Sequence, residues 1–287
     1  MEITELLRFI NAAHGTSFSV VGKCAGGTRG AYEIADPTGR RAVLKSDPRP
    51  SWIAQLRRVV PITEHLRAIG YPTPRIHFVG VAPDGMPYYV QDFALGAPMA
   101  ALTPDNLDLL LALNDRQANQ HVATEQNWSA YVWRVVFAGE SGWAATLRGH
   151  APATADLLAA VEALTRRYRD TRLPTADVVH GDFSPDNVLV LDGRVTAVID
   201  FAAAGRGTRA IDLARLLVWS YDDLDASSRQ RLHARIRDIA GVAGLTICLA
   251  EQILDLIAYT IDHHAPADVA QAVRLGRRLL DELSPAG

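Results

Sequence analysis

The sequence HGDFSPDNVLV occupies residues 180–190, and VIDF follows at residues 198–201. These segments place the carboxylates of Asp182 and Asp200 and the carboxamide of Asn187 on loops that flank a short predicted hairpin. Phosphoryl transfer depends on positioning and charge neutralisation, so oxygen ligands for Mg²⁺ are typical of its sites. In this interpretation Asp182 accepts or orients the proton of a substrate hydroxyl, while Asn187 and Asp200 hold metal ions.

The residues before this segment predict an antiparallel sheet with one helix. After a short amphipathic helix, residues 18–47 alternate strand-forming and turn-forming stretches, and residues 36–39 have the composition of a hairpin turn. Apolar residues at helical spacing predict a helix over residues 52–69. Two further strands are predicted, over residues 76–81 and 88–93.

A break in the pattern near Leu95 separates this sheet from a helical remainder. Residues 104–170 are alanine-rich and helical in pattern, and residues 178–199 are strand-forming before helical periodicity resumes. We therefore expect an α+β fold with an N-terminal lobe at residues 1–95, a hinge at 91–96 and a larger helical lobe at 96–287 that carries the hairpin. The repeated strand–helix alternation of a parallel doubly wound sheet is missing.

Composition limits the class of protein. A chain of 287 residues with 48% hydrophobic residues is long enough for two lobes. The net charge of −3 argues against a nucleic-acid partner, which would require a basic surface. Cys24 and Cys248 lack metal-ligand spacing, so neither a zinc site nor a disulfide scaffold is expected. We expect a cytoplasmic protein without a membrane partner, because the start lacks signal-peptide features and no stretch suggests a membrane span.

The string H-G-D-x-x-x-x-N followed by I-D-F resembles the aminoglycoside phosphotransferase family, whose members are distant relatives of protein kinases. This resemblance implies a bilobal protein-kinase-like fold and a cytoplasmic kinase that uses ATP or GTP with Mg²⁺. It also implies Asp182 as the catalytic residue and Asn187 and Asp200 as metal ligands. Downstream, residues 208–214 resemble the family's G-x-P-x-x-D-L-A element without its proline, and Asp212 is expected to brace the catalytic-loop backbone.

Weaker motifs in the N-terminal half extend the resemblance. GGTRGAY at residues 26–32 is similar to the glycine-rich turn over the phosphates, with Gly27 and Thr28 as its binding positions. AVLK at residues 42–45 is similar to the V-A-I-K strand, so Lys45 is expected to contact the α- and β-phosphates. At the hinge, the family's adenine-binding backbone groups correspond to Asp92 and Ala94.

One position departs from the family pattern. Family enzymes pair the strand lysine with a glutamate on the N-lobe helix, but that register falls on Ile62 in this sequence. Glu64 lies two positions away, which rotates it to the far side of an ideal helix. Glu64 is nevertheless the candidate partner of Lys45, and the pair requires a register shift or a break at Pro61.

The acceptor site of such enzymes lies in the helical lobe. Acidic and aromatic residues gather in residues 127–133 and 219–225 and on the C-terminal helices, and an acidic cleft with aromatic edges attracts cationic substrates. The candidate acceptor-binding residues are acidic: Asp222, Asp223, Glu251 and Asp255. The resemblance therefore implies a kinase that phosphorylates a hydroxyl of a cationic antibiotic, an aminoglycoside or a basic cyclic peptide of the viomycin or capreomycin type, and so confers resistance.

Two other functions remain open from the sequence. A kinase of the same fold could act on a small metabolite such as choline, homoserine or a sugar. A pseudokinase would bind nucleotide without phosphorylating anything, although the joint presence of Lys45, Asp182, Asn187 and Asp200 argues against it. The identity of the antibiotic, the choice between ATP and GTP and the oligomeric state are not determined by the sequence.

Overall fold

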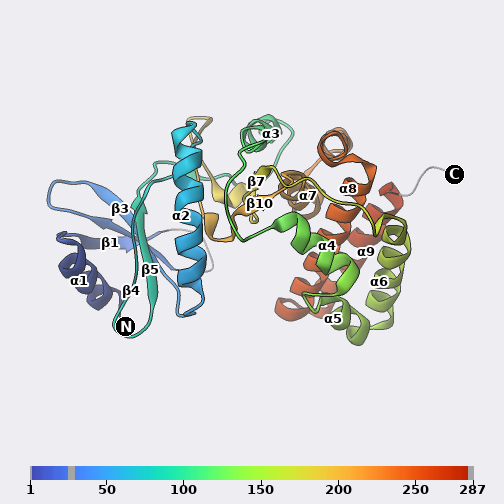
Figure 1. Ribbon diagram of the computed structural model, residues 1–287, viewed down its shortest axis with the longest axis horizontal. Coiled ribbons are helices and arrows are strands. Elements are labelled where there is room, and N and C mark those ends of the chain that lie inside the picture. Colours follow the sequence, from blue (N-terminus) through green and yellow to red (C-terminus); the bar gives the residue numbers. More distant parts are fainter. Residues whose placement is uncertain (1, 25–29, 284–287) are drawn as a thin grey trace. The chain divides into compact units, whose positions relative to one another are not determined.

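The computed structural model describes residues 2–24 and 30–283, and the chain folds into two compact units (Figure 1). One unit comprises Met1–Ala100 together with Pro185–Ala204, and the other comprises Ala101–Ser184 together with Gly205–Gly287. The chain therefore crosses between the units three times. The residues proposed for catalysis fall in both, with Asp182 in the second unit and Lys45, Asn187 and Asp200 in the first.

A five-stranded antiparallel sheet forms the centre of the first unit, in the order β1-β2-β3-β5-β4. Its strands confirm the sheet expected from the sequence: β1 (Ser19–Lys23), β2 (Ala31–Ala35), β3 (Arg41–Ser46), β4 (Ile76–Val81) and β5 (Pro87–Asp92). The turn between β2 and β3 is held by Asp36, whose carboxylate accepts hydrogen bonds from the amide and hydroxyl of Thr38. Gly39 supplies the positive φ of 86° that this turn needs.

Helices cover the two faces of this sheet, α1 (Ile3–His14) on one face and α2 (Trp52–Ala68) on the other (Figure 1). Successive side chains of a strand point to opposite faces. On β3, Ala42 and Leu44 join the core beneath α1, so Lys45 points to the face that α2 covers. On β5, Tyr88 and Val90 lie beneath α1 while Tyr89 packs against Trp52 of α2.

The predicted hairpin is formed by β8 (Val188–Leu191) and β9 (Arg194–Val198). Asp192 and Gly193 connect the strands with φ values of 50° and 73°, as a tight hairpin turn requires. The short strand β6 (Ala97–Pro98) pairs with β8, and the amide of Val198 donates a 2.5 Å hydrogen bond to the carbonyl of Pro72. These contacts explain why the hairpin belongs to the same compact unit as the five-stranded sheet.

The second unit is mainly helical. Its helices are α3 (Leu107–Asp115), α4 (Trp128–Ala138), α5 (Trp143–His150), α6 (Pro152–Thr165), α7 (Ala210–Trp219), α8 (Ala226–His263) and α9 (Pro266–Leu283). The strands β7 (Asp177–Val179) and β10 (Gly205–Gly207) form a small antiparallel pair beside α4. Four short 3-10 helices complete the described chain: η1 (Arg166–Tyr168), η2 (Pro185–Asn187), η3 (Phe201–Ala203) and η4 (Tyr221–Asp223). The α+β fold class predicted from the sequence is therefore confirmed.

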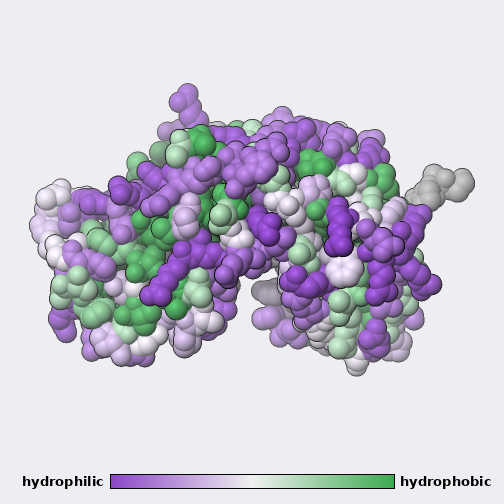
Figure 2. All heavy atoms as spheres, in the orientation of Figure 1, coloured by the Kyte–Doolittle hydropathy of each residue, from purple (hydrophilic) through white to green (hydrophobic). Residues whose placement is uncertain are grey.

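The long helix α8 corrects one expectation from the sequence. It is long enough and apolar enough to cross a membrane, with a mean hydropathy of 1.6 over its most apolar window, whereas no such stretch was expected. Of that window, 61% is buried inside the fold, and Gly241 interrupts the helix with φ 73° and ψ 176°. The helix α8 is apolar because most side chains in that window are buried inside the fold, as in a core helix. On the face in view, hydrophilic side chains are mixed with hydrophobic ones, and hydrophobic side chains gather over the middle of the first unit (Figure 2).

Candidate active site

The open end of the β8–β9 hairpin brings Asn187 and Asp200 together. Val188 pairs with Val198, and the amide of Ile199 donates a 2.9 Å hydrogen bond to the carbonyl of Asn187. Asp200 is the next residue and adopts a left-handed backbone conformation, with φ 65° and ψ 48°. This conformation is uncommon outside glycine, although aspartate and asparagine adopt it more readily than other residues, and residues held in it gather at functional sites. The hairpin therefore presents an amide and a carboxylate at one end.

Lys45 lies beside this carboxylate. Its Nζ is 3.1 Å from Oδ2 of Asp200, and the side chains of Lys45 and Asp200 are 15% and 36% exposed. The strand register puts Lys45 opposite Tyr89 of β5. Burial raises the pKa of the Tyr89 hydroxyl well above its usual value, and the charge of Asp200 adds to this effect. Lys45 is thus the cation that offsets Asp200 at this end of the sheet.

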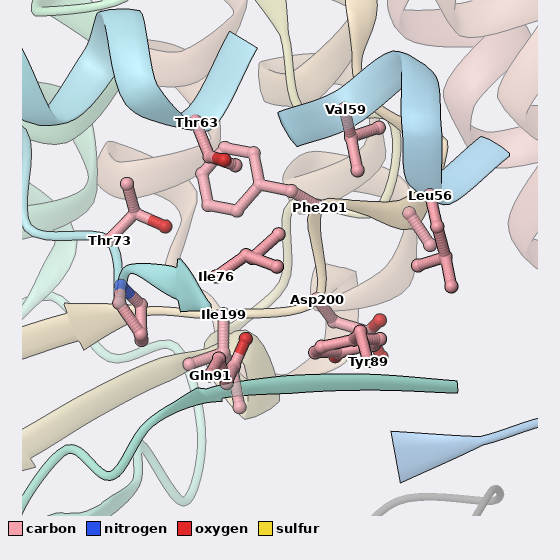
Figure 3. A pocket seen from close by; sticks show the side chains of 12 residues that line it. Leu56, Val59, Thr63, Thr73, Ile76, Tyr89, Gln91, Ile199, Asp200 and Phe201 are labelled. Carbon is pink, nitrogen blue, oxygen red and sulfur yellow. The ribbon is translucent and has the colours of Figure 1, made fainter. Parts of the chain in front are cut away.

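A narrow pocket adjoins Asp200 within the first unit (Figure 3). Its wall is built from α2, from β4 and β5 and from the segment after β9, and includes Leu56, Thr63, Ile76, Tyr89, Gln91 and Phe201. In Figure 3, Asp200 lies next to Tyr89, whereas Phe201 lies beneath α2 near Thr63 and Val59. The buried ring of Phe201 fixes the backbone from which Asp200 projects.

Glu64 does not pair with Lys45, which corrects the partner expected from the sequence. The helix α2 continues through Pro61 without a break, so Ile62 is buried and Glu64 is exposed. A residue two positions along a helix turns by about 200°, which places the Glu64 carboxylate on the side of α2 away from the sheet. Asp200 takes the place of the expected partner.

The two residues expected at the hinge are Asp92, which ends β5, and Ala94, which lies just beyond it. The amide of Asp92 donates to the carbonyl of Arg75, and its carboxylate is 2.6 Å from Nε2 of His77. Ala94 follows the strand and is half-buried. Gly27 and Thr28, the expected phosphate-binding positions, lie outside the described residues.

In the second unit, Asp212 of α7 fixes the loop that carries Asp182. Its carboxylate accepts hydrogen bonds from the amides of His180 at 2.8 Å and Gly181 at 3.0 Å, and from Nε2 of Gln117 at 2.9 Å. Burial raises the pKa of this carboxyl, and the amide hydrogen bonds partly offset the increase. The brace expected from the sequence is therefore confirmed. His180 is fully buried, and its Nδ1 accepts from the amide of Asp182 at 3.2 Å.

The Asp182 side chain is held by Arg215, which the sequence analysis did not single out. Nη2 of Arg215 is 2.7 Å from Oδ1 of Asp182, and Nη1 is 3.3 Å from Oδ2 of Asp255 on α8. Arg215 follows Asp212 by three residues, so both project from the same side of α7 toward the catalytic loop. That spacing is the signal in the sequence that could have identified it.

Two of the four acidic candidates for acceptor binding join this cluster. Glu251 is 2% exposed, and burial together with the charge of Asp255 raises its pKa to about 8. Burial also raises the pKa of Asp255, while Arg215 lowers it. Burial raises the pKa of the Tyr131 hydroxyl on α4 to about 12, and the nearby charges of Glu251 and Asp255 add to this increase. The acceptor stretch expected at residues 127–133 thus contributes a side chain near these carboxylates.

The other two acidic candidates lie elsewhere on the second unit. Asp222 and Asp223 are exposed on η4. The carboxylate of Asp222 is 3.1 Å from Nη2 of Arg278, a residue of α9. The described contacts of Asp222 therefore lead to α9 and not to Asp182.

The family follows from the whole pattern of motifs. A model described as the phosphotransferase enzyme family matches residues 23–245, which include Lys45, the catalytic loop and Asp200. The chain belongs to this family. The matched residues include the H-G-D and I-D-F motifs of this chain, and the resemblance to this family is confirmed.

Two curated relatives align with this phosphotransferase family member over only part of their own length. An aminoglycoside 3'-phosphotransferase from Escherichia coli is 40% identical over 63 residues, which are 22% of this chain and 22% of that enzyme. A homoserine kinase from Xanthobacter autotrophicus is 27% identical over 173 residues, 57% of this chain and 53% of that kinase. The matches thus span about a fifth and about half of these two proteins.

Solved structures extend the likeness of the fold to nearly the whole chain. A thermostable mutant of the aminoglycoside phosphotransferase APH(4)-Ia, in ternary complex with AMP-PNP and hygromycin B, superposes with a TM-score of 0.75 at 18% identity, covering 100% of both chains. The amicoumacin kinase hAmiN, in complex with AMP-PNP, Ca²⁺ and Ami, gives a TM-score of 0.67 at 15% identity and covers 99% of this chain and 96% of that one. The protein-kinase-like fold of this family member is therefore confirmed.

Proposed function

We propose that the protein transfers the γ-phosphoryl group of a nucleoside triphosphate to a hydroxyl of a cationic antibiotic, an aminoglycoside or a basic cyclic peptide. The observation that supports it best is the hairpin end at which Asn187 and Asp200 meet and at which Lys45 is bonded to Asp200. Two oxygen donors beside one cation suit a triphosphate with its metal ion.

The donor set fits Mg²⁺ bound together with a nucleotide. Among the described residues, no group of three or more His, Cys, Asp or Glu side chains could hold a metal. Mg²⁺ is bound in kinases by one or two protein oxygens together with substrate phosphates and water, so Asn187 and Asp200 suffice as protein ligands. When bound, the metal neutralises charge on the transferring phosphoryl group.

Each residue has a proposed role in the reaction. Lys45 binds the α- and β-phosphates, and the backbone of Asp92 and Ala94 binds the base. The acceptor oxygen attacks the γ-phosphorus, the bond from phosphorus to the β,γ-bridging oxygen breaks, and the acceptor proton passes to the carboxylate of Asp182. In this scheme residues 1–95 with the hinge at 91–96 bind the nucleotide, and residues 96–287 carry the metal ligands, Asp182 and the acceptor site.

The charge around Asp182 supports a cationic acceptor. Asp182 and Asp255 are two carboxylates that share one guanidinium, that of Arg215, and the buried Glu251 beside Asp255 keeps its proton near neutral pH because its pKa is about 8. A protonated amine of an acceptor would be attracted to this side of the catalytic loop. Hygromycin B, which is bound in the APH(4)-Ia complex, belongs to the class of acceptor that we propose.

The test is a turnover panel with ATP or GTP and Mg²⁺. Nucleoside diphosphate release and product mass are measured for aminoglycosides, basic cyclic peptides, homoserine, choline and sugars. We expect turnover of at least one antibiotic to exceed that of every metabolite, and Asp182→Asn to lower it by about 1,000-fold. The matched control is Asp186→Asn, an exposed aspartate of the same loop.

A second candidate function is a kinase for a small metabolite, which the partial match to a homoserine kinase favours. It predicts that homoserine, choline or a sugar is the best acceptor in the same panel. Nucleotide binding without turnover of any acceptor would instead indicate a pseudokinase. A cytoplasmic location, with neither nucleic acid nor a membrane as partner, is part of the same proposal.

A further inference from the structure

Arg215 links the catalytic loop to α8 through two carboxylates. Its Nη2 donates to Oδ1 of Asp182 at 2.7 Å, and its Nη1 donates to Oδ2 of Asp255 at 3.3 Å. Asp182 and Asp255 are 73 residues apart in the sequence, so only the packing of α7 against α8 brings them to one guanidinium. The planar guanidinium presents its donors in a fixed fork, which defines the direction of each bond.

The position of the Arg215 side chain is itself restricted. Its guanidinium lies 4.9 Å from the ring centre of Trp219, and the indole Nε1 of Trp219 donates to Oε1 of Gln252 at 3.2 Å. Nε of Arg215 is buried and has no hydrogen-bond partner among the described residues. A buried donor without a partner costs free energy. The hydrogen bonds from Nη2 to Asp182 and from Nη1 to Asp255 offset this cost.

The backbone and the side chain of the catalytic residue are held by different residues of α7. Asp212 binds the amides of His180 and Gly181 and so fixes the loop backbone. Arg215 binds no backbone group of this loop in the described contacts and bonds the carboxylate of Asp182 instead. Because the loop has its own brace, removing the guanidinium would remove the bond from Arg215 to the Asp182 carboxylate without removing the support of the loop backbone.

We propose that Arg215 is a positioning residue that orients the carboxylate of Asp182 toward the acceptor hydroxyl, with Asp255 as its anchor on α8. This inference rests on the proposed role of Asp182 in phosphoryl transfer. Arg215 binds Oδ1 and thereby fixes the rotation of the carboxylate about its last torsion, which is otherwise broad. A misplacement of a reacting group by about 1 Å can lower a rate roughly 100-fold.

The test compares Arg215→Gln and Arg215→Lys with the control Arg231→Gln. Arg231 pairs with Asp108, whose side chain is 75% exposed, and neither is assigned to the site. We expect Arg215→Gln to lower kcat by about 100-fold while the KM for the nucleotide stays unchanged, because the nucleotide-binding residues are untouched. Arg215→Lys keeps one charge–carboxylate contact and is expected to recover about ten-fold of this loss.

A double-mutant cycle separates positioning from a purely structural role. If Arg215 acts through Asp182, Arg215→Gln should have no further effect on the residual turnover of Asp182→Asn. Equal losses in both backgrounds, or an unchanged kcat in Arg215→Gln, would overturn the inference. If Arg215→Gln does not fold, Asp255→Asn removes the anchor and is expected to lower kcat by about ten-fold at constant nucleotide KM; an unchanged kcat there would equally overturn it.

Failure of this inference can be distinguished from failure of the proposed function. Full turnover in Asp182→Asn would refute the catalytic role of Asp182 and remove the basis for a role of Arg215. Loss of turnover in Asp182→Asn with full turnover in Arg215→Gln would refute the positioning role only.

Discussion

Replacing Asp212 with alanine removes the brace of the catalytic loop. The carboxylate is 1% exposed and accepts from two backbone amides, those of His180 and Gly181, and from the side chain of Gln117. His180 and Gln117 are themselves fully buried, so water cannot replace the lost acceptor for their donors. Asp212→Ala therefore leaves at least two buried N–H groups without a partner.

The expected loss of stability follows from these contacts. Each buried donor left without an acceptor costs about 2 kcal/mol, which gives about 4 kcal/mol for His180 and Gln117. Burial raises the pKa of Asp212, so removing the desolvated carboxyl returns part of this free energy. We expect Asp212→Ala to lower the free energy of unfolding by about 3 kcal/mol. Asp212→Asn should lose less, because its amide oxygen still accepts one hydrogen bond.

The assay is urea unfolding followed by tryptophan fluorescence at constant pH. The matched control is Asp108→Ala, because Asp108 is 75% exposed and pairs with another exposed side chain, that of Arg231; a change within about 0.5 kcal/mol is expected there. A loss below about 1 kcal/mol in Asp212→Ala, with unchanged turnover, would refute the view that Asp212 holds the loop.

Three further outcomes are expected. The folded state raises the pKa of Glu251 to about 8, so the folded protein keeps a proton that the unfolded chain releases, and this contribution to stability is lost as pH rises from about 4.5 to 8. Relative to the parent, Glu251→Gln should therefore gain stability across that range, by at most about 5 kcal/mol. Urea unfolding at several pH values measures the difference in stability between the two proteins, and a difference that stays constant with pH would contradict the raised pKa of Glu251. Gly80→Ala should lower the free energy of unfolding by about 2 kcal/mol, because a Cβ there would lie 2.5 Å from the hydroxyl and 2.6 Å from Cζ of the buried Tyr88; an unchanged melting temperature would show that the ring can move. Lys45→Met should lower kcat/KM for the nucleotide by about 100-fold, since it removes the cation bonded to Asp200, and calorimetry that finds unchanged nucleotide affinity would contradict a phosphate-binding role.

The fold was predictable because its signals are local. Strand alternation, the turn at residues 36–39 and the helical periodicity of residues 52–69 are each determined by neighbours in the chain. Strand alternation also determines which face Lys45 occupies once Leu44 is buried. The same reasoning gave the correct face of α2, on which Ile62 is buried and Glu64 is exposed. The predicted pairing of Lys45 with Glu64 was wrong because it followed the lysine–glutamate pair of the family and set aside the helical geometry, which turns Glu64 away from the sheet.

The acceptor side was less predictable because its contacts join distant segments. Composition selected Asp222 and Asp223 together with Glu251 and Asp255, and only the packing of the helices separates the two pairs. Asp222 contacts Arg278 on α9, whereas Asp255 contacts Arg215 on α7. Composition does not distinguish an acidic residue at a helix end from one inside a core helix. Burial raises the pKa of the residue inside the core helix and so favours its neutral form.

The sequence by itself determined the family, the fold class and the placement of Asp182, Asn187 and Asp200 on loops beside a hairpin, because motif spacing and periodicity are properties of contiguous chain. Tertiary structure alone decided that Lys45 bonds Asp200 and that Arg215 bonds both Asp182 and Asp255. Lys45 and Asp200 are 155 residues apart, and Arg215 and Asp255 are 40 apart. Such pairs depend on how strands and helices pack, since side chains far apart in sequence meet only after the elements that carry them are in place.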